Sequence, residues 1–240
     1  MTNPTSTQCR EAIRAIIDDY RKATSARAPG QKHRVVLIGH GWCAEIHRLA
    51  EAALSLIDND FRHESLILVR TAWEMTISLH WLTQKGDKGA EGVFSEGARQ
   101  SKALLGDMAK AKFDIPQNVL DAVLQLPYDK TEEALTFKYF QQQCDAIDPS
   151  RLLYSVYRHL SGSAHPSDTA AHPFLNPLTD PPGLMMNPRD SPPASEVTMA
   201  QCLIWAGRSF DSLVSGQPRK QFLKQKAREL GLVPVLPHVN

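Results

Sequence analysis

The segment 61–83 constrains the fold most, because its periodicity is helical and nearly every side of that helix is apolar. Within 66–82, Arg70 and Glu74 are the only formally charged residues, and their i, i+4 spacing places both on one helix face. A helix of this kind is stable in water when other elements surround it. We therefore predict that this segment lies at the centre of the fold.

Helical periodicity continues along the chain, and alternating strand patterns are nearly absent. Half of the sixteen prolines fall in 166–193, which excludes regular helix or central strand there. The sequence thus predicts an all-α fold: one helical bundle over 1–217 with a long proline-rich loop at 166–194, then a basic helix and tail at 218–240. The expected helices span 7–24, 33–57, 61–83, 90–112, 116–125, 131–146, 150–164, 195–215 and 218–231, with a linker at 86–92.

Composition excludes several classes of protein. The net charge is +1, so a partner such as RNA must be recruited by local charge rather than by the overall field. No apolar run approaches the ~18 residues of a membrane span, and the first ten residues lack the apolar core of a secretory signal. The four cysteines are isolated, as is typical of a reducing compartment. We expect a cytoplasmic protein without a membrane partner.

One helix face carries side chains that could bind a transition metal. His40, Cys43, His47 and Glu51 follow at intervals of three and four residues, and imidazole, thiolate and carboxylate are ligands of zinc. However, successive turns are about 5.4 Å apart, so one straight helix rarely offers more than two or three ligands to one ion. We expect a polar helix face here and neither a metal nor another cofactor; a metal-dependent enzyme is the least favoured alternative.

The charged pair of the central helix has two interpretations. Arg70 and Glu74 can form a buried structural ion pair, which is tolerable in an apolar helix when the two charges meet. Alternatively, Arg70 contacts an anion and Glu74 orients it. The sequence leaves both interpretations open.

Polar side chains also gather just before the proline-rich loop. If 150–164 is helical, Tyr154, Arg158, Ser161 and His165 lie on one stripe, close enough to converge on a phosphate-sized group. Pro166 disfavours helical backbone at His165, which places this imidazole at the helix end. Without a metal, arginine can stabilise charge developing on a phosphate while histidine moves a proton. On RNA, the substrate's own 2′-hydroxyl can be the nucleophile.

The element Arg158-His159-x(5)-His165 resembles the Arg-x(4–6)-His motif near the end of a late helix in HEPN-type helical domains. Leu68-Val-Arg-Thr-Ala-Trp-Glu74, combined with Tyr157-Arg-His-Leu-Ser-x-x-x-His-Pro166, also resembles a bacterial family of uncharacterised helical proteins. In active HEPN domains these residues form a metal-independent ribonuclease site, usually where two subunits meet. The resemblance implies a homodimer acting on RNA, in a defence or toxin setting, with Arg158 and His165 catalytic. Arg70, Glu74, Tyr154 and Ser161 would bind or orient.

Spacing alone does not single out this element. Arg27 with His33, and Arg34 with His40, also satisfy Arg-x(4–6)-His, but an alanine and a valine follow these arginines. Arg158 differs by the polar residue after it, by its place near a predicted helix end and by the adjoining loop. A non-catalytic helical interaction module remains the alternative, in which Arg158 and His165 pin the loop to the bundle.

The last predicted helix is basic. It could bind a polyanion such as RNA through counterion release, or it could be a solvated terminal helix. Its basic residues are Arg219, Lys220, Lys224, Lys226 and Arg228.

Overall fold

The computed structural model describes residues 4–22, 33–179, 181, 183–188 and 194–239 of the protein. These residues are mostly helical, so the all-α prediction is confirmed. The major helices are α1 (Ser6–Lys22), α2 (His33–Asp58), α3 (Arg62–Lys110), α9 (Ala194–Asp211) and α10 (Lys220–Glu229). Shorter ones are α4 (Gln117–Leu124), α5 (Glu132–Lys138), α6 (Phe140–Ile147) and α7 (Leu152–Ser161). Residues 23 and 24 of the first expected helix lie outside the described ranges.

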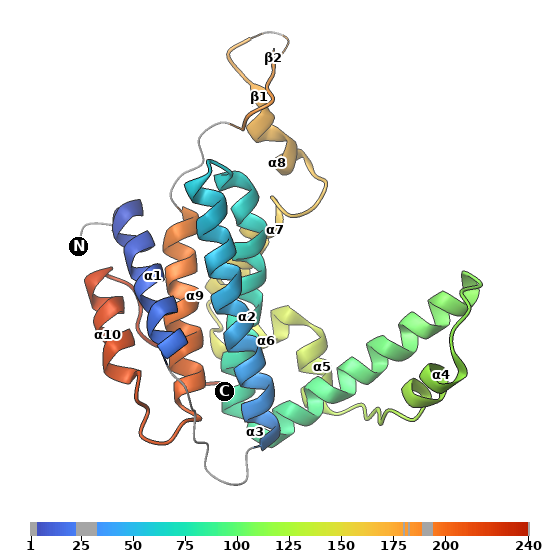
Figure 1. The fold of residues 1–240 in the computed structure, drawn as a ribbon. Coiled ribbons are helices and arrows are strands. Elements are labelled where there is room, and N and C mark those ends of the chain that lie inside the picture. Colours follow the sequence, from blue (N-terminus) through green and yellow to red (C-terminus); the bar gives the residue numbers. More distant parts are fainter. Residues whose placement is uncertain (1–3, 23–32, 180, 182, 189–193, 240) are drawn as a thin grey trace.

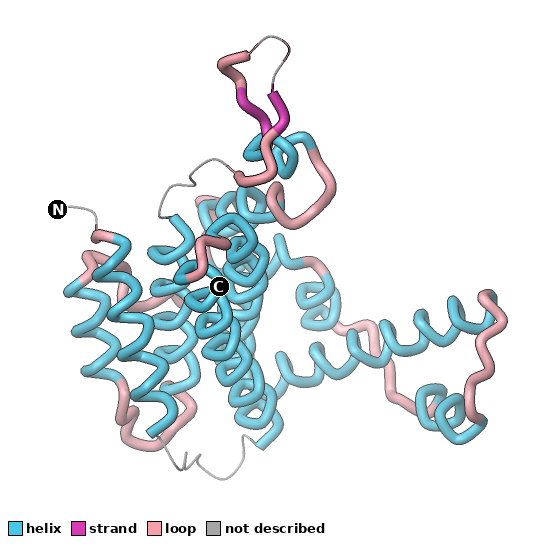
Figure 2. The backbone as a smooth tube through the Cα atoms, turned by 45° about the horizontal axis from the view of Figure 1, so that its top comes forward, coloured by secondary structure: helices cyan, strands magenta, loops and turns pink. Residues whose placement is uncertain are grey.

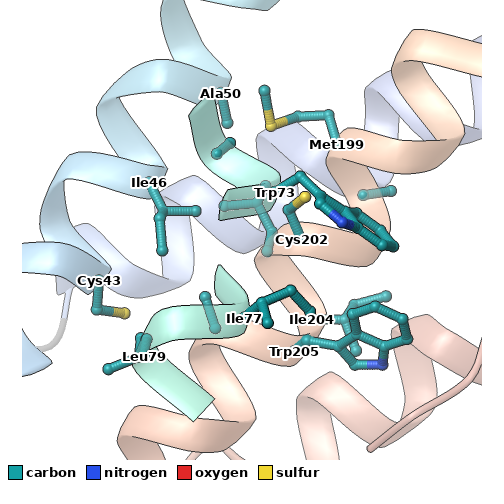
Figure 3. Packing of buried hydrophobic residues seen from close by; sticks show 14 of the residues in the cluster. Cys43, Ile46, Ala50, Trp73, Ile77, Leu79, Met199, Cys202, Ile204 and Trp205 are labelled. Atoms are coloured by element: carbon teal, nitrogen blue, oxygen red, sulfur yellow. The ribbon is translucent and has the colours of Figure 1, made fainter. Parts of the chain in front are cut away.

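Helices α1, α2, α9 and the first half of α3 run side by side as a bundle, and α10 covers its edge beside α9 (Figure 1). The first half of α3 is central, as predicted from its apolar surface, and it contacts α2 and α9 most extensively. Its side chains Ile77, Leu79, Trp81 and Leu82 are fully buried. Figure 3 shows how residues of the three helices meet: Cys43 and Ile46 of α2, Trp73 and Ile77 of α3, and Met199 and Cys202 of α9.

The predicted linker at 86–92 is longer than the break in the structure, because the chain departs from helical geometry only at Gly86 and residues 87–92 are helical. Gly86 has φ 62° and ψ −136°, a backbone conformation that is strained for any residue with a side chain. The two expected helices 61–83 and 90–112 are therefore one kinked helix. Gly92 is helical and lies against α5, where a Cβ atom would be 2.7 Å from the Glu133 carbonyl carbon.

Beyond Gly86, the second half of α3 and the short helix α4 project from the bundle as an arm (Figures 1 and 2). We use "arm" for residues 99–126. Helix α4 buries none of its side chains, and large apolar groups on the arm are open to solvent. These groups include Leu104, Phe113 and Leu124, with exposed fractions of 61%, 66% and 57%.

Two further segments differ in detail from the prediction. The segment 131–146 divides into α5 and α6, because Tyr139 between them is extended, at φ −111° and ψ 100°. The proline-rich segment, which we expected to be irregular, contains a single helical turn, α8 (Asp168–Ala171), and the 3₁₀ turn η1 (His172–Phe174). It also contains a minimal antiparallel pair, β1 (Leu175–Asn176) with β2 (Gly183–Leu184). Its residues 180, 182 and 189–193 lie outside the described ranges.

A buried carboxylate joins the N-terminal ends of three helices. Glu196 of α9 is fully buried, and it pairs with Arg62 at the start of α3. Ser6 of α1 donates to it at 2.7 Å, and Ser195 donates at 2.8 Å. Burial acts to raise the pKa of Glu196, but these hydrogen bonds outweigh it and the pKa is lowered overall. The ionised Glu196 carboxylate therefore fixes the N-terminal ends of α1, α3 and α9 relative to one another.

The C-terminal segment packs on the bundle through α10. Leu223 of α10 is fully buried. Its Cδ1 is 2.8 Å from the position that a Cβ atom of Gly207 would occupy, so α9 and α10 approach closely. No described helix has a stretch long and apolar enough to cross a bilayer.

Two glycines of α3 provide a matched test of this packing. Gly92→Ala forces a Cβ against the backbone of Glu133 and Ala134, and we expect it to lower the free energy of unfolding by about 1–3 kcal/mol. Gly97→Ala gains the same helix propensity with nothing within 4 Å of its Cβ, so we expect stabilisation of up to about 1 kcal/mol. Urea unfolding followed by circular dichroism measures both; equal effects would contradict the close approach of α3 and α5.

Candidate functional site

Arg70 of α3 is the centre of the site, because its guanidinium bridges α3 and α7. Its Nη2 donates to the Tyr157 hydroxyl at 2.6 Å and lies 3.3 Å from Glu74 Oε2. Its Nε donates to Ser161 Oγ over a longer distance, 3.4 Å. The guanidinium carbon also lies 4.9 Å from the centre of the Tyr157 ring. The two sequence elements that resembled one family therefore meet in space.

This Arg70 network is half-buried rather than sealed in the core. The Arg70 side chain is 20% exposed and that of Glu74 is 36% exposed. Of the two interpretations of this pair, a fully buried core ion pair does not describe it. Glu74 keeps its second oxygen, Oε1, free of hydrogen bonds to any described residue. A ligand can therefore reach this carboxylate.

Helix α7 is positioned by its own buried side and by α3. Leu153 and Leu160 are buried, and Trp73 Nε1 donates to the Leu153 carbonyl at 3.1 Å. Ser161 Oγ donates to the Tyr157 carbonyl at 2.8 Å, one turn back. The rings of Tyr154 and Tyr157 stack with centroids 5.9 Å apart. These contacts present tyrosine rings towards the junction of α5 and α6.

A pocket of about 530 Å³ opens beside this network. Its walls come from α3, α7 and the break between α5 and α6, where the extended backbone of Tyr139 turns the chain. The lining combines aromatic rings, side-chain amides, one carboxylate and one ammonium group. The residues are Glu74, Lys138, Tyr139, Phe140, Gln141, Gln142, Tyr154 and Tyr157.

Arg158 and His165 do not line this pocket, although the predicted stripe grouped them with Tyr154 and Ser161. Helix α7 ends at Ser161 and not at residue 164, so His165 lies beyond the helix in the following turn. Both side chains are exposed, and neither makes a hydrogen bond or ion pair with any described residue. The structure therefore joins Arg70, Glu74, Tyr157 and Ser161, and leaves the Arg158–His165 pair on the surface.

The loop is attached by other residues. Ser167 Oγ donates to the Gly162 carbonyl at 2.9 Å, and the ring of Phe174 meets that of His63 edge-on, with centroids 5.6 Å apart. The expectation that Arg158 and His165 pin the loop to the bundle has no described contact to support it.

The face with His40, Cys43, His47 and Glu51 is divided among different surroundings. Glu51 pairs with Arg21 at 2.6 Å, on the surface, whereas His47 is buried and stacks on Tyr20 at 3.9 Å. Burial lowers the pKa of His47 to about 4 and raises that of the Cys43 thiol to about 12. Among the described residues, no three His, Cys, Asp or Glu side chains form a group that could hold a metal ion.

The basic residues of the C-terminal segment point in different directions. Arg219 is 11% exposed; it donates to Asp19 Oδ2 at 2.6 Å and lies 5.0 Å from the centre of the Tyr20 ring. Lys226 pairs with Glu229 at 2.8 Å. Arg228 is exposed, and Lys220 and Lys224 are half-buried. Arg219 therefore fastens α10 to α1 and is not part of an open basic surface.

Fold and site define the class of protein: an all-α bundle in which a charged pair on the central helix faces a tyrosine-bearing helix beside an open pocket. Residues 36–182 match the model of a family described as "Family of unknown function (DUF5677)". Because this match covers more than half of the chain, the protein belongs to that family. The matched segment contains every residue of the Arg70 network. No curated protein and no solved structure matches the chain.

Tyr157 is the residue of the network that the sequence-based candidate list lacks, and its hydroxyl can be tested alone. Tyr157→Phe removes the acceptor 2.6 Å from Arg70 Nη2 and leaves a half-buried charged donor without it. We expect a loss of about 1–2 kcal/mol in the free energy of unfolding. The control is Tyr139→Phe, whose hydroxyl makes no hydrogen bond to described residues and whose ring is 48% exposed. Equal unfolding midpoints in urea would rule out the bond to Arg70.

Proposed function

We propose that the protein binds RNA and cleaves it without a metal ion, with Arg158 and His165 acting on the phosphodiester group. The observation that carries this proposal is that both side chains are exposed and make no hydrogen bond or ion pair with described residues. Both side chains are therefore open to an RNA phosphate. The resemblance to HEPN-type domains supports the same assignment.

In the proposed reaction, the 2′-hydroxyl of the ribose attacks the adjacent phosphorus atom. His165 accepts the proton of that hydroxyl, and Arg158 stabilises the negative charge that develops on the phosphate oxygens. The bond from phosphorus to the 5′-oxygen breaks, leaving a cyclic phosphate on one product and a 5′-hydroxyl on the other. The leaving oxygen needs a proton from a second acid. A homodimer, which we include in the proposal, would supply a second imidazole by bringing two copies of this segment together.

Arg70 and Glu74 have a supporting role in this proposal. The Arg70 guanidinium already binds Tyr157, Ser161 and Glu74, and it orients α7 through Tyr157 and Ser161. Tyr154 and Ser161 belong to the same helix and place Arg158 relative to the pocket.

The proposal is tested by incubating the purified protein with single-stranded RNA, with and without EDTA. We expect cleavage that EDTA does not abolish, a decrease of about 10²–10⁴-fold for His165→Ala, and one of about 10²–10³-fold for Arg158→Ala. Because both residues are exposed, the melting temperature should not change. The matched control is His33→Ala, an exposed histidine that also satisfies the Arg-x(4–6)-His pattern. Intact RNA, or cleavage by His165→Ala at the rate of the control, would refute the catalytic role.

A second candidate function is a non-catalytic interaction module. The observation that favours it is the arm, whose apolar side chains Leu104, Phe113 and Leu124 face solvent. Apolar surface of this kind is a common feature of protein–protein interfaces. In this case the arm carries the binding energy, and the surface around Arg158 does not.

If the arm mediates association, Leu104→Ser with Phe113→Ser should lower the molar mass in solution from that of an assembly to that of one chain. The free energy of unfolding of the single chain should change by less than about 0.5 kcal/mol, because both side chains are exposed. Light scattering after size-exclusion chromatography measures the mass. Leu178→Ser, which alters a loop residue that is 92% exposed, is the control. An unchanged mass would remove the arm as the contact surface.

A further inference from the structure

We infer that the pocket between α3, α7 and the α5–α6 break binds one unpaired nucleobase, with guanine preferred. This inference rests on the proposed RNA function and deepens it, because it names the part of the substrate that this chain selects. It depends on three features of the pocket: ring faces, a free carboxylate oxygen and nearby cations.

The ring faces suit an unpaired base. Tyr154 and Tyr157 stack at an interplanar angle of 24°, and Phe140 lies 4.5 Å from Tyr157 at an angle of 52°, so the three rings form an aromatic cluster at the pocket. Tyr139, on the other side of the opening, is 48% exposed. Proteins that bind single-stranded RNA place bases against such rings, because every base has a π-face to stack. A volume of about 530 Å³ accommodates a base with part of its ribose.

The free oxygen of Glu74 selects the edge of the base. Arg70 occupies Oε2 at 3.3 Å, whereas Oε1 makes no hydrogen bond to any described residue. An ionised carboxylate accepts hydrogen bonds and donates none. The Watson–Crick edge of guanine presents two adjacent donors, N1–H and the N2 amino group, whereas the other three bases present one donor group each. The Gln142 side chain, which is exposed and makes no hydrogen bond to described residues, can donate to the guanine O6.

The cations place the phosphates. Lys138 is exposed at the rim of the pocket, where a neighbouring phosphate can reach it. Arg158 follows Tyr154 by four residues on α7, which is slightly more than one turn, or about 6 Å along the helix axis. A base stacked on Tyr154 therefore brings its adjoining phosphate near Arg158. The pocket would select the nucleotide whose phosphodiester group Arg158 and His165 then act on.

The experiment measures binding before cleavage. The wild-type protein is titrated with each of the four nucleoside monophosphates, and with a short oligouridylate with or without one central guanosine. A 2′-O-methyl group at every position of both oligonucleotides removes each attacking hydroxyl and so blocks cleavage during the titration. We expect guanosine monophosphate to bind about tenfold more tightly than the other three, and the guanosine-containing RNA to bind more tightly than the oligouridylate. Equal binding of the four bases would overturn the inference. The inference also fails if the protein prefers guanosine monophosphate but binds the two oligonucleotides equally, because the pocket then does not recognise a base within RNA.

Two variants separate stacking from edge recognition. Tyr154→Ala should weaken binding of all four bases by about tenfold, because it removes the stacking face. Glu74→Gln should remove the preference for guanine while other bases still bind, since an amide offers one acceptor and adds a donor. Phe113→Ala, which removes an exposed aromatic ring from the arm, is the control and should bind as wild type. Melting temperatures confirm that each variant is folded, and Tyr154→Phe, which keeps the ring, should restore binding if Tyr154→Ala unfolds.

Failure of this inference is distinguishable from failure of the proposed function. If the wild type cleaves RNA equally at all four bases, the proposed guanine selection by the pocket is refuted and the catalytic proposal stands. Guanine-selective binding without any cleavage would support the pocket and refute catalysis by Arg158 and His165.

Discussion

The burial of the first half of α3 is the constraint on which the other elements depend. Ile77, Leu79 and Trp81 have no exposure, so neighbouring helices, chiefly α2 and α9, must cover this helix. The charges of Arg70 and Glu74 cannot lie against those apolar neighbours without a large desolvation penalty. They therefore face the remaining side, where α7 supplies polar groups. The position of the candidate site follows from the need to keep two charges out of the core of the bundle.

The partners of Arg70 determine which residues stay free for a ligand. A guanidinium has five donors, and this one contacts a hydroxyl, a second hydroxyl and one carboxylate oxygen. Glu74 already compensates the positive charge of Arg70. A phosphate bound to the same guanidinium would place a second negative charge beside that of Glu74. Arg219 is likewise committed, to Asp19 and to the Tyr20 ring. Arg158 differs from both, because it has no such partner among the described residues.

The periodicity of the sequence was sufficient to predict the fold class and the central position of 61–83, because both depend on burial patterns. It could not show which glycine of the predicted linker would leave helical geometry, since each of the three lacks a side chain and the close approach of α5 to Gly92 is a tertiary contact. The Arg70–Glu74 pair was accessible from its spacing, and the resemblance named Ser161 as a further candidate, but the contact between Arg70 and Ser161 was not predicted. The end of α7 at Ser161, which separates His165 from the stripe, depends on the turn that follows and was not accessible.

The angular order of residues on α7 explains why Arg158 is exposed while its neighbours are engaged. At about 100° per residue, the buried Leu153 and Leu160 define one side of the helix. Tyr157 lies about 50° from the centre of that side and Ser161 about 90°, which brings both to Arg70, whereas Arg158 lies about 150° away. Tyr154, at about 110°, stands between the two groups. A ligand that reaches from the Arg70 side to the solvent side of α7 must therefore pass over Tyr154. An extended RNA strand can do so with a base on Tyr154 and a phosphate at Arg158.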